Sequence, residues 1–95
     1  MILVLALAMA AMVAQEAAME RCAEAVVARL HPKIGMADMT GASFEWLQIS
    51  GVALDLVIIG SFIEPHGKER VAHRFTCRTH GMKPPRVAID KLIGR

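Results

Sequence analysis

One stretch of the chain, Glu69 to Thr79, alternates between two kinds of side chain more regularly than any other. A repeat of two is typical of a half-buried β-strand, because successive side chains of a strand point to opposite faces. The predicted outer face carries Arg70, Ala72, Arg74, Thr76 and Arg78. The predicted inner face carries Val71, His73, Phe75 and Cys77. This strand therefore predicts a sheet that buries one face against another layer and leaves arginines on the other.

The chain is short and its charge is unevenly distributed. Its 95 residues suffice for one small domain. Residues 1–65 contain three basic and seven acidic side chains, whereas residues 66–95 contain eight basic and two acidic ones. The basic part favours an anionic partner, such as an acidic protein, a lipid head group or nucleic acid. The alternative is a charged surface that only keeps the protein soluble.

The N-terminal segment, residues 1–14, has no charged or polar side chain. It is shorter than the roughly 20 residues of a membrane-spanning helix. Its length and the small residues around its end are typical of the apolar region of a signal peptide, with cleavage expected after Ala10 or Ala14. No basic residue precedes it, so an uncleaved anchor helix and a buried core helix remain alternatives. We expect residues 1–14 to be a signal peptide or apolar anchor helix, and residues 15–95 to form a single small domain.

The sequence of residues 15–95 predicts one helix and four strands. The helix covers residues 16–30 and stops at His31-Pro32, because the residue before a proline avoids the helical conformation. Its apolar stripe consists of Ala18, Cys22, Ala25, Val26 and Leu30. The expected strands cover residues 44–49, 52–63, 69–79 and 86–93. The expected turns lie at Ser50-Gly51, residues 64–68 and residues 80–85.

Short connections favour antiparallel neighbours. The predicted fold is therefore α+β, with an N-terminal apolar leader helix and one amphipathic helix packed on a four-stranded antiparallel meander. In the second strand the expected core side comprises Val52, Leu54, Leu56, Ile58 and Phe62. Asp55 is expected on the opposite, partly covered side.

The two cysteines, Cys22 and Cys77, are both predicted to face the core, one from the helix and one from a strand. In an exported protein two cysteines usually pair. A disulfide between Cys22 and Cys77 would close a loop with 54 intervening residues. Such a bond contributes about 4 kcal/mol to the free energy of unfolding in the chain-entropy model. In a cytosolic protein the same residues would be two buried free thiols.

The chain combines a helix with a Cys-x7-Leu spacing and a nearby proline, a later Phe-x-Cys strand and a final Val-x-Ile strand. It resembles small exported bacterial domains of uncharacterised function. The matching residues are Cys22, Leu30, Phe75, Cys77, Val87 and Ile89. The resemblance spans most of the chain, although Pro32 arrives one position early. It implies export and a disulfide, and it implies no catalytic residue.

Metal and catalytic chemistry find little support. Zinc-ligand types occur at His66, His73, Cys77 and His80. On a strand, however, His73 and Cys77 would have Cα atoms about 13 Å apart, and a disulfide would consume Cys77. None of the serines lies in a nucleophile motif, and no phosphate-binding glycine motif occurs. We therefore expect no enzyme activity, no metal and no cofactor.

The sequence favours a small exported domain, periplasmic or secreted, that acts as a binding or structural protein. Its expected anion-binding residues are Lys68, Arg70, Arg74, Arg78, Lys83 and Arg86. The expected partner is an unidentified protein or an anionic component of the cell envelope. Nucleic acid is disfavoured, because the aromatic side chains are not interleaved with the arginines.

Two other classes remain. One is a cytoplasmic or membrane-associated basic protein that binds nucleic acid or another anionic partner through the arginine face. The other is a subunit of a larger assembly whose N-terminal helix is buried against its neighbours. An uncleaved N-terminal segment would anchor the protein to a membrane, and self-association stays open.

Overall fold

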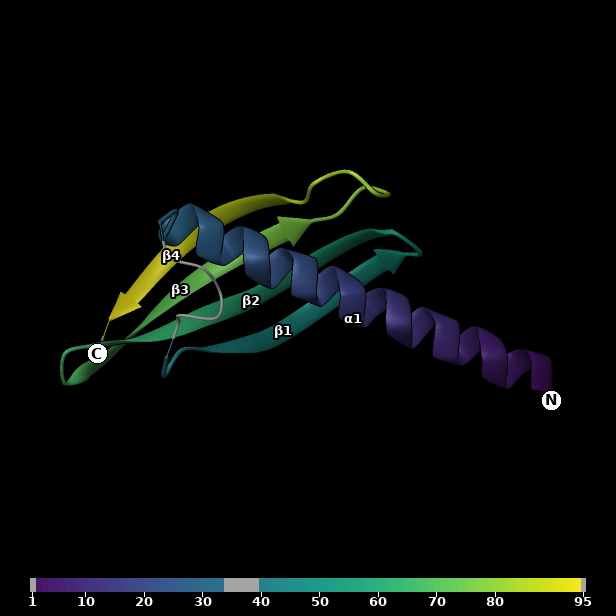
Figure 1. The fold of residues 1–95 in the computed structure, drawn as a ribbon, viewed down its shortest axis with the longest axis horizontal. Helices are drawn as coiled ribbons and strands as arrows, with labels where there is room; N and C mark the ends of the chain where they lie inside the picture. The colour runs from purple at the N-terminus through teal and green to yellow at the C-terminus, as the bar shows by residue number, and fades with distance from the viewer. Residues whose placement is uncertain (1, 34–39, 95) are drawn as a thin grey trace.

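The computed structural model describes the backbone of residues 2–33 and 40–94, and the side chains of residues 15–33 and 40–90. One helix, α1 (Ile2–Leu30), precedes four strands. The strands are β1 (Ser43–Val52), β2 (Asp55–His66), β3 (Glu69–Arg78) and β4 (Arg86–Gly94). They form one antiparallel sheet in the order β1-β2-β3-β4, and α1 crosses one face of it (Figure 1). The predicted α+β arrangement of one helix on a four-stranded antiparallel meander is confirmed.

The core lies between the C-terminal half of α1 and the sheet. The fully buried side chains of the helix include Cys22, Val26 and Val27. The sheet contributes Leu56, Ile58, Phe62, Phe75 and Cys77. Ala18 is also buried, while Ala25 and Leu30 lie at the half-buried margin of the predicted stripe. The alternation of β3 is as predicted, because Phe75 and Cys77 face the helix.

A disulfide joins Cys22 of α1 to Cys77 of β3 in the middle of this core. Neither cysteine is exposed, and their Cα atoms are 6.0 Å apart. The bond links residues 55 positions apart in the chain. It therefore ties the helix layer to the sheet layer covalently.

The first hairpin differs from the prediction at Ser50-Gly51. Both residues belong to β1, and the turn consists of Ala53 and Leu54, with Val52 paired to Asp55. Gly51 has a φ of 115°, and a Cβ there would collide with the Asp55 carbonyl oxygen. The glycine is thus needed for the close approach of two strands, which a sequence pattern cannot distinguish from a turn glycine.

Because the first hairpin turns at Ala53 and Leu54, the expected core side of β2 is only partly right. Leu56, Ile58 and Phe62 are buried as predicted, but Val52 is 80% exposed and Leu54 is 43% exposed. The prediction for these two was wrong because Val52 ends β1 and Leu54 lies in the turn. Asp55, expected on a partly covered side, is exposed at the first position of β2.

The second hairpin also turns later than expected. β2 continues to His66, which pairs with Glu69, and only Gly67 and Lys68 form the turn. Glu64 was assigned to this turn and instead lies inside β2, where it is buried on the helix-facing side. Pro65 is compatible with a strand here because it lies near the strand end.

The helix stops at Leu30, as His31-Pro32 predicted, and the His31 amide donates to the Val27 carbonyl over 2.7 Å. At its other end α1 runs without a break across the expected boundary at Ala14. Its N-terminal part extends well past the sheet, which gives the molecule dimensions of 51 × 24 × 22 Å (Figure 1). No helix in the described part of the chain is long and apolar enough to cross a membrane. Cleavage of residues 1–14 stays a prediction.

Candidate functional site

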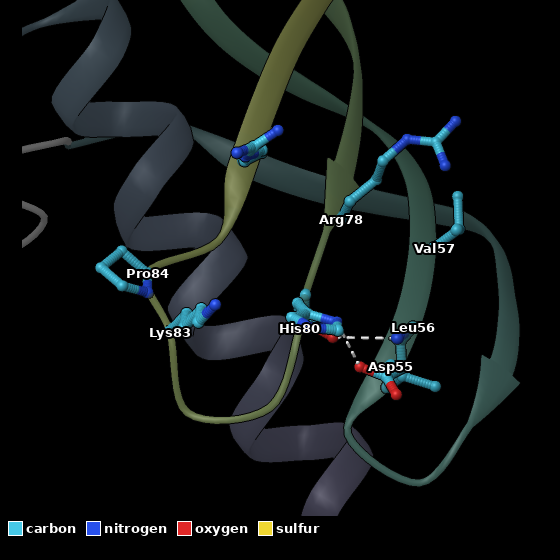
Figure 2. A pocket seen from close by; sticks show the side chains of 9 residues that line it. Asp55, Leu56, Val57, Arg78, His80, Lys83 and Pro84 are labelled. Atoms are coloured by element: carbon cyan, nitrogen blue, oxygen red, sulfur yellow. Dashed lines mark hydrogen bonds and ion pairs between the residues drawn. The ribbon is translucent and has the colours of Figure 1, made fainter.

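A groove lies at the end of the sheet where β2 begins and β3 ends. We call it the basic groove. Its volume is about 640 Å³. Nine residues line it, namely Asp55, Leu56, Val57, Arg78, Thr79, His80, Lys83, Pro84 and Arg86. They come from the starts of β2 and β4, the end of β3 and the loop between β3 and β4 (Figure 2).

Thr79 fixes the geometry of this end of the sheet. Its buried hydroxyl donates to the Leu54 carbonyl over 2.8 Å and accepts from the Leu56 amide over 3.0 Å. Its own amide donates to the Leu56 carbonyl over 2.9 Å. The chain after β3 is therefore held against the start of β2, which places His80 beside Asp55.

Three cationic side chains border the basic groove. Arg78 and Arg86 occupy directly paired positions of β3 and β4, on the face away from α1. Lys83 belongs to the loop that joins these strands, and all three side chains are exposed. Within the described residues, none of them forms an ion pair with a carboxylate. Like charges at directly opposite positions of an antiparallel pair repel each other, so this arrangement favours a bound anion.

The walls of the groove differ in polarity. Figure 2 shows Arg78 extending from β3 over β2, past Val57, with Lys83 and Pro84 on the loop. His80 Nδ1 lies 2.9 Å from Asp55 Oδ1, and both side chains are largely exposed. Val57 and Pro84 supply the apolar part of the wall. The groove thus combines cations with an apolar surface, a combination suited to binding an anion that carries an organic group.

The loop between β3 and β4 is attached to the helix by Arg21. One Nη of Arg21 donates to the Gly81 carbonyl over 3.4 Å, and the other donates to the Lys83 carbonyl. Within the loop, the Lys83 amide donates to the His80 carbonyl over 3.2 Å. The position of Lys83 in the groove therefore depends on a side chain of α1.

The six basic residues predicted from the sequence do not form one site. Arg78, Lys83 and Arg86 all line the groove. Arg74 lies farther along β3, where its Nε donates to Ser61 Oγ over 3.2 Å. Arg70 and Lys68 lie near the opposite end of the sheet, and Arg70 donates to the Gly41 carbonyl over 3.4 Å.

Besides the three cations, the groove contains three polar residues that sequence reasoning did not assign to it. The sequence marks His80 only as a zinc-ligand type, places Asp55 on a partly covered side of its strand, and gives Thr79 no role of its own. Thr79 ends the strand predicted over residues 69–79, and its partners at positions 54 and 56 are visible only in the folded hairpin. In the described part of the chain, no three His, Cys, Asp or Glu side chains are arranged to hold a metal ion.

A second polar cluster lies on the helix-facing side of the sheet. Glu64 Oε2 is 2.7 Å from His31 Nε2, and Glu64 Oε1 is 2.8 Å from His73 Nε2. Burial raises the pKa of Glu64. The hydrogen bonds from His73 and His31, and the charge of these two side chains, lower the pKa by more than burial raises it, so it lies below its ordinary value of 4.5. The cluster joins the end of α1 to β2 and β3, which indicates a structural role.

Comparisons with models of known protein families, with curated proteins and with solved structures found no match. The resemblance to small exported bacterial domains therefore stays a prediction, and the function has to be argued from the chain's own residues.

Proposed function

We propose that this protein is a small exported, non-catalytic domain, periplasmic or secreted, that binds an anionic partner and is stabilised by its disulfide. The observation that carries the proposal is the disulfide between Cys22 and Cys77. Disulfides form and persist in oxidising compartments and are rare in the cytosol. A small domain gains particularly from such a bond because its core is thin.

The placement of the core along α1 also supports export. The first described core residue of the helix is Ala18, which follows both expected cleavage positions, Ala10 and Ala14. The part of α1 before them extends beyond the sheet (Figure 1). Removal of residues 1–14 would therefore leave the disulfide and the described core intact.

The composition of the basic groove supports binding rather than catalysis. Arginine stays protonated in proteins, so Arg78 and Arg86 serve as donors and not as bases. Thr79 carries the only hydroxyl side chain among the nine lining residues. That hydroxyl is committed to two backbone groups, Leu54 and Leu56, and is not free to act as a nucleophile activated by His80.

The test is the intact mass of the natively expressed protein, measured after thiol alkylation with and without prior reduction. We expect a mass that lacks ten or fourteen N-terminal residues, with alkylation at Cys22 and Cys77 only after reduction. A full-length chain in which both thiols react at once would overturn export and the disulfide together.

A second candidate function is that of a subunit whose N-terminal helix is buried against neighbouring subunits. The extension of α1 beyond the sheet favours it, because residues 1–14 are apolar and an apolar helix needs a cover. This reading predicts a full-length mass together with oligomers in solution. Size-exclusion chromatography with light scattering on the same preparation separates the two: a shortened, monomeric chain excludes the subunit.

A further inference from the structure

We propose that the basic groove is a binding site for a phosphate monoester attached to a small organic group. The inference deepens the proposed binding role and rests on it. Three cationic side chains, Arg78, Lys83 and Arg86, and one carboxylate, Asp55, line the groove, so its formal charge is +2 when His80 is neutral. A phosphate monoester carries a charge of about −1.5 to −2 at pH 7. It therefore neutralises the groove, whereas a single carboxylate or a phosphodiester leaves one positive charge unbalanced.

The donors are suited to several oxygens of one anion. Guanidinium groups present planar pairs of N–H donors that match phosphate oxygens. Arg78 and Arg86 are directly paired across β3 and β4, so their side chains start from adjacent points of the same sheet face. Lys83, on the loop between these strands, adds a compact charge with three donors. A phosphate bound between Arg78 and Arg86 would replace the repulsion between the two arginines by attraction of each to the anion.

The size and the walls of the groove indicate that the anion carries an organic group. A volume of about 640 Å³ falls within the range of small-molecule sites and exceeds what a bare phosphate fills. Val57 and Pro84 offer apolar contacts beside the cations. The exposed Asp55 and His80 offer polar groups at one side of the groove, where hydroxyls of the organic group would lie.

Two sources supply this chemistry, a soluble phosphate monoester and a lipid with a monoester head group. The natively expressed, oxidised protein is titrated with glycerol 3-phosphate by calorimetry. In parallel it is sedimented with phosphatidylcholine vesicles that contain or lack phosphatidic acid. Binding to glycerol 3-phosphate identifies the soluble source, and binding only to vesicles with phosphatidic acid identifies the lipid.

The variants Arg78→Gln and Arg86→Gln test the assignment of the groove. Each is expected to weaken binding about tenfold or more, because each removes a charge-assisted hydrogen bond. Arg70→Gln is the matched control, since it removes the same charge from the same strand about 26 Å away. It is expected to change the affinity less than twofold, because salt screens charges at such a distance. Equal weakening in all three variants would overturn the groove and point to general charge attraction.

Glycerate, which carries one carboxylate, tests the charge of the ligand. We expect it to bind several-fold more weakly than glycerol 3-phosphate, and equal affinity would overturn the monoester. Absence of binding to glycerol 3-phosphate and to both vesicle types would overturn the inference as a whole. The mass and alkylation results on the same preparation keep the two proposals apart: a shortened, disulfide-bonded chain that binds none of these probes contradicts the ligand and leaves export standing.

Discussion

Glu64 is the buried carboxylate of the described core, and each of its oxygens contacts one imidazole. His31 follows directly after α1, and His73 lies on β3, so the carboxylate connects the helix end to two neighbouring strands. A buried carboxylate is costly unless it is hydrogen-bonded. Here both oxygens have a partner, and no buried side-chain polar atom of the described residues lacks one. The cluster therefore stabilises the contact between the layers.

The variant Glu64→Gln tests this contribution. We expect it to lower the free energy of unfolding at pH 7 by about 1–3 kcal/mol, because an amide cannot accept from both imidazoles. The pKa of Glu64 is lowered in the folded state, so its ionised form stabilises the protein above about pH 4.5. That stabilisation is lost as the pH falls below 4.5 through the folded-state pKa.

The change in the free energy of unfolding is measured by urea unfolding of the wild type and the variant at pH values from about 3 to 7. This range follows from the linkage of protonation to folding. The difference between the two proteins should shrink toward acid pH. The control is Glu69→Gln, which replaces an exposed glutamate of β3. It should change the free energy of unfolding little at any pH. A difference that stays constant with pH would contradict the role given to the ionised carboxylate.

Glu64 also shows where sequence reasoning stops. Pro65, His66 and Gly67 are strong turn signals directly after it, and they led to its assignment to the turn. In the structure β2 continues to His66, two residues beyond Glu64. Glu64 is therefore a strand residue, and its side chain faces His73 and His31. Register decides which face a strand residue occupies, and the turn pattern alone did not fix the register.

Among the helix and strands, the elements with clear periodicity were predictable. β3 was expected over residues 69–79 and is observed at Glu69–Arg78, and α1 ends where His31-Pro32 predicted. The basic groove was predictable only in part, because Arg78, Lys83 and Arg86 stand out by charge. Their separation from Arg70 and Lys68 follows from the length of β3, and the roles of Thr79 and Asp55 follow from the first hairpin.

Two arginines of α1 make a matched pair for testing how the helix supports the sheet. Arg21 donates to the loop carbonyls of Gly81 and Lys83, while Arg29 donates to the Val87 carbonyl of β4 over 3.2 Å. Arg21→Ala should therefore speed amide hydrogen exchange in the loop at residues 80–85, whereas Arg29→Ala should not. Both variants should lower the free energy of unfolding by only about 1 kcal/mol or less, because the bonds are largely exposed.

Hydrogen exchange followed by mass spectrometry on both variants measures this local effect. Faster exchange of the loop in both variants, or in neither, would show that Arg21 does not hold the loop. The outcome matters for the basic groove because Lys83 belongs to the held segment.

Across the whole molecule, the two layers differ in charge. Exposed glutamates, Glu16, Glu20 and Glu24, lie on α1, whereas arginines occupy the sheet face away from the helix. The three glutamates of α1 and the arginines of the sheet therefore lie on different sides of the folded protein, and Asp55 is the carboxylate that lines the basic groove itself. This separation keeps the basic groove free of the chain's own helix carboxylates and leaves it available to an external anion.

The division of α1 into a packed part and an extending part gives the last prediction. A chain that begins at Gln15 should fold to the same domain, because the first described core residue of the helix is Ala18. We expect its free energy of unfolding to lie within about 1 kcal/mol of that of the full-length protein, with the same Cys22–Cys77 bond. Urea unfolding together with alkylation before and after reduction measures both. If the shortened chain failed to fold or to form the disulfide, residues 1–14 would be an integral part of the domain, and the expected cleavage after Ala14 would be wrong.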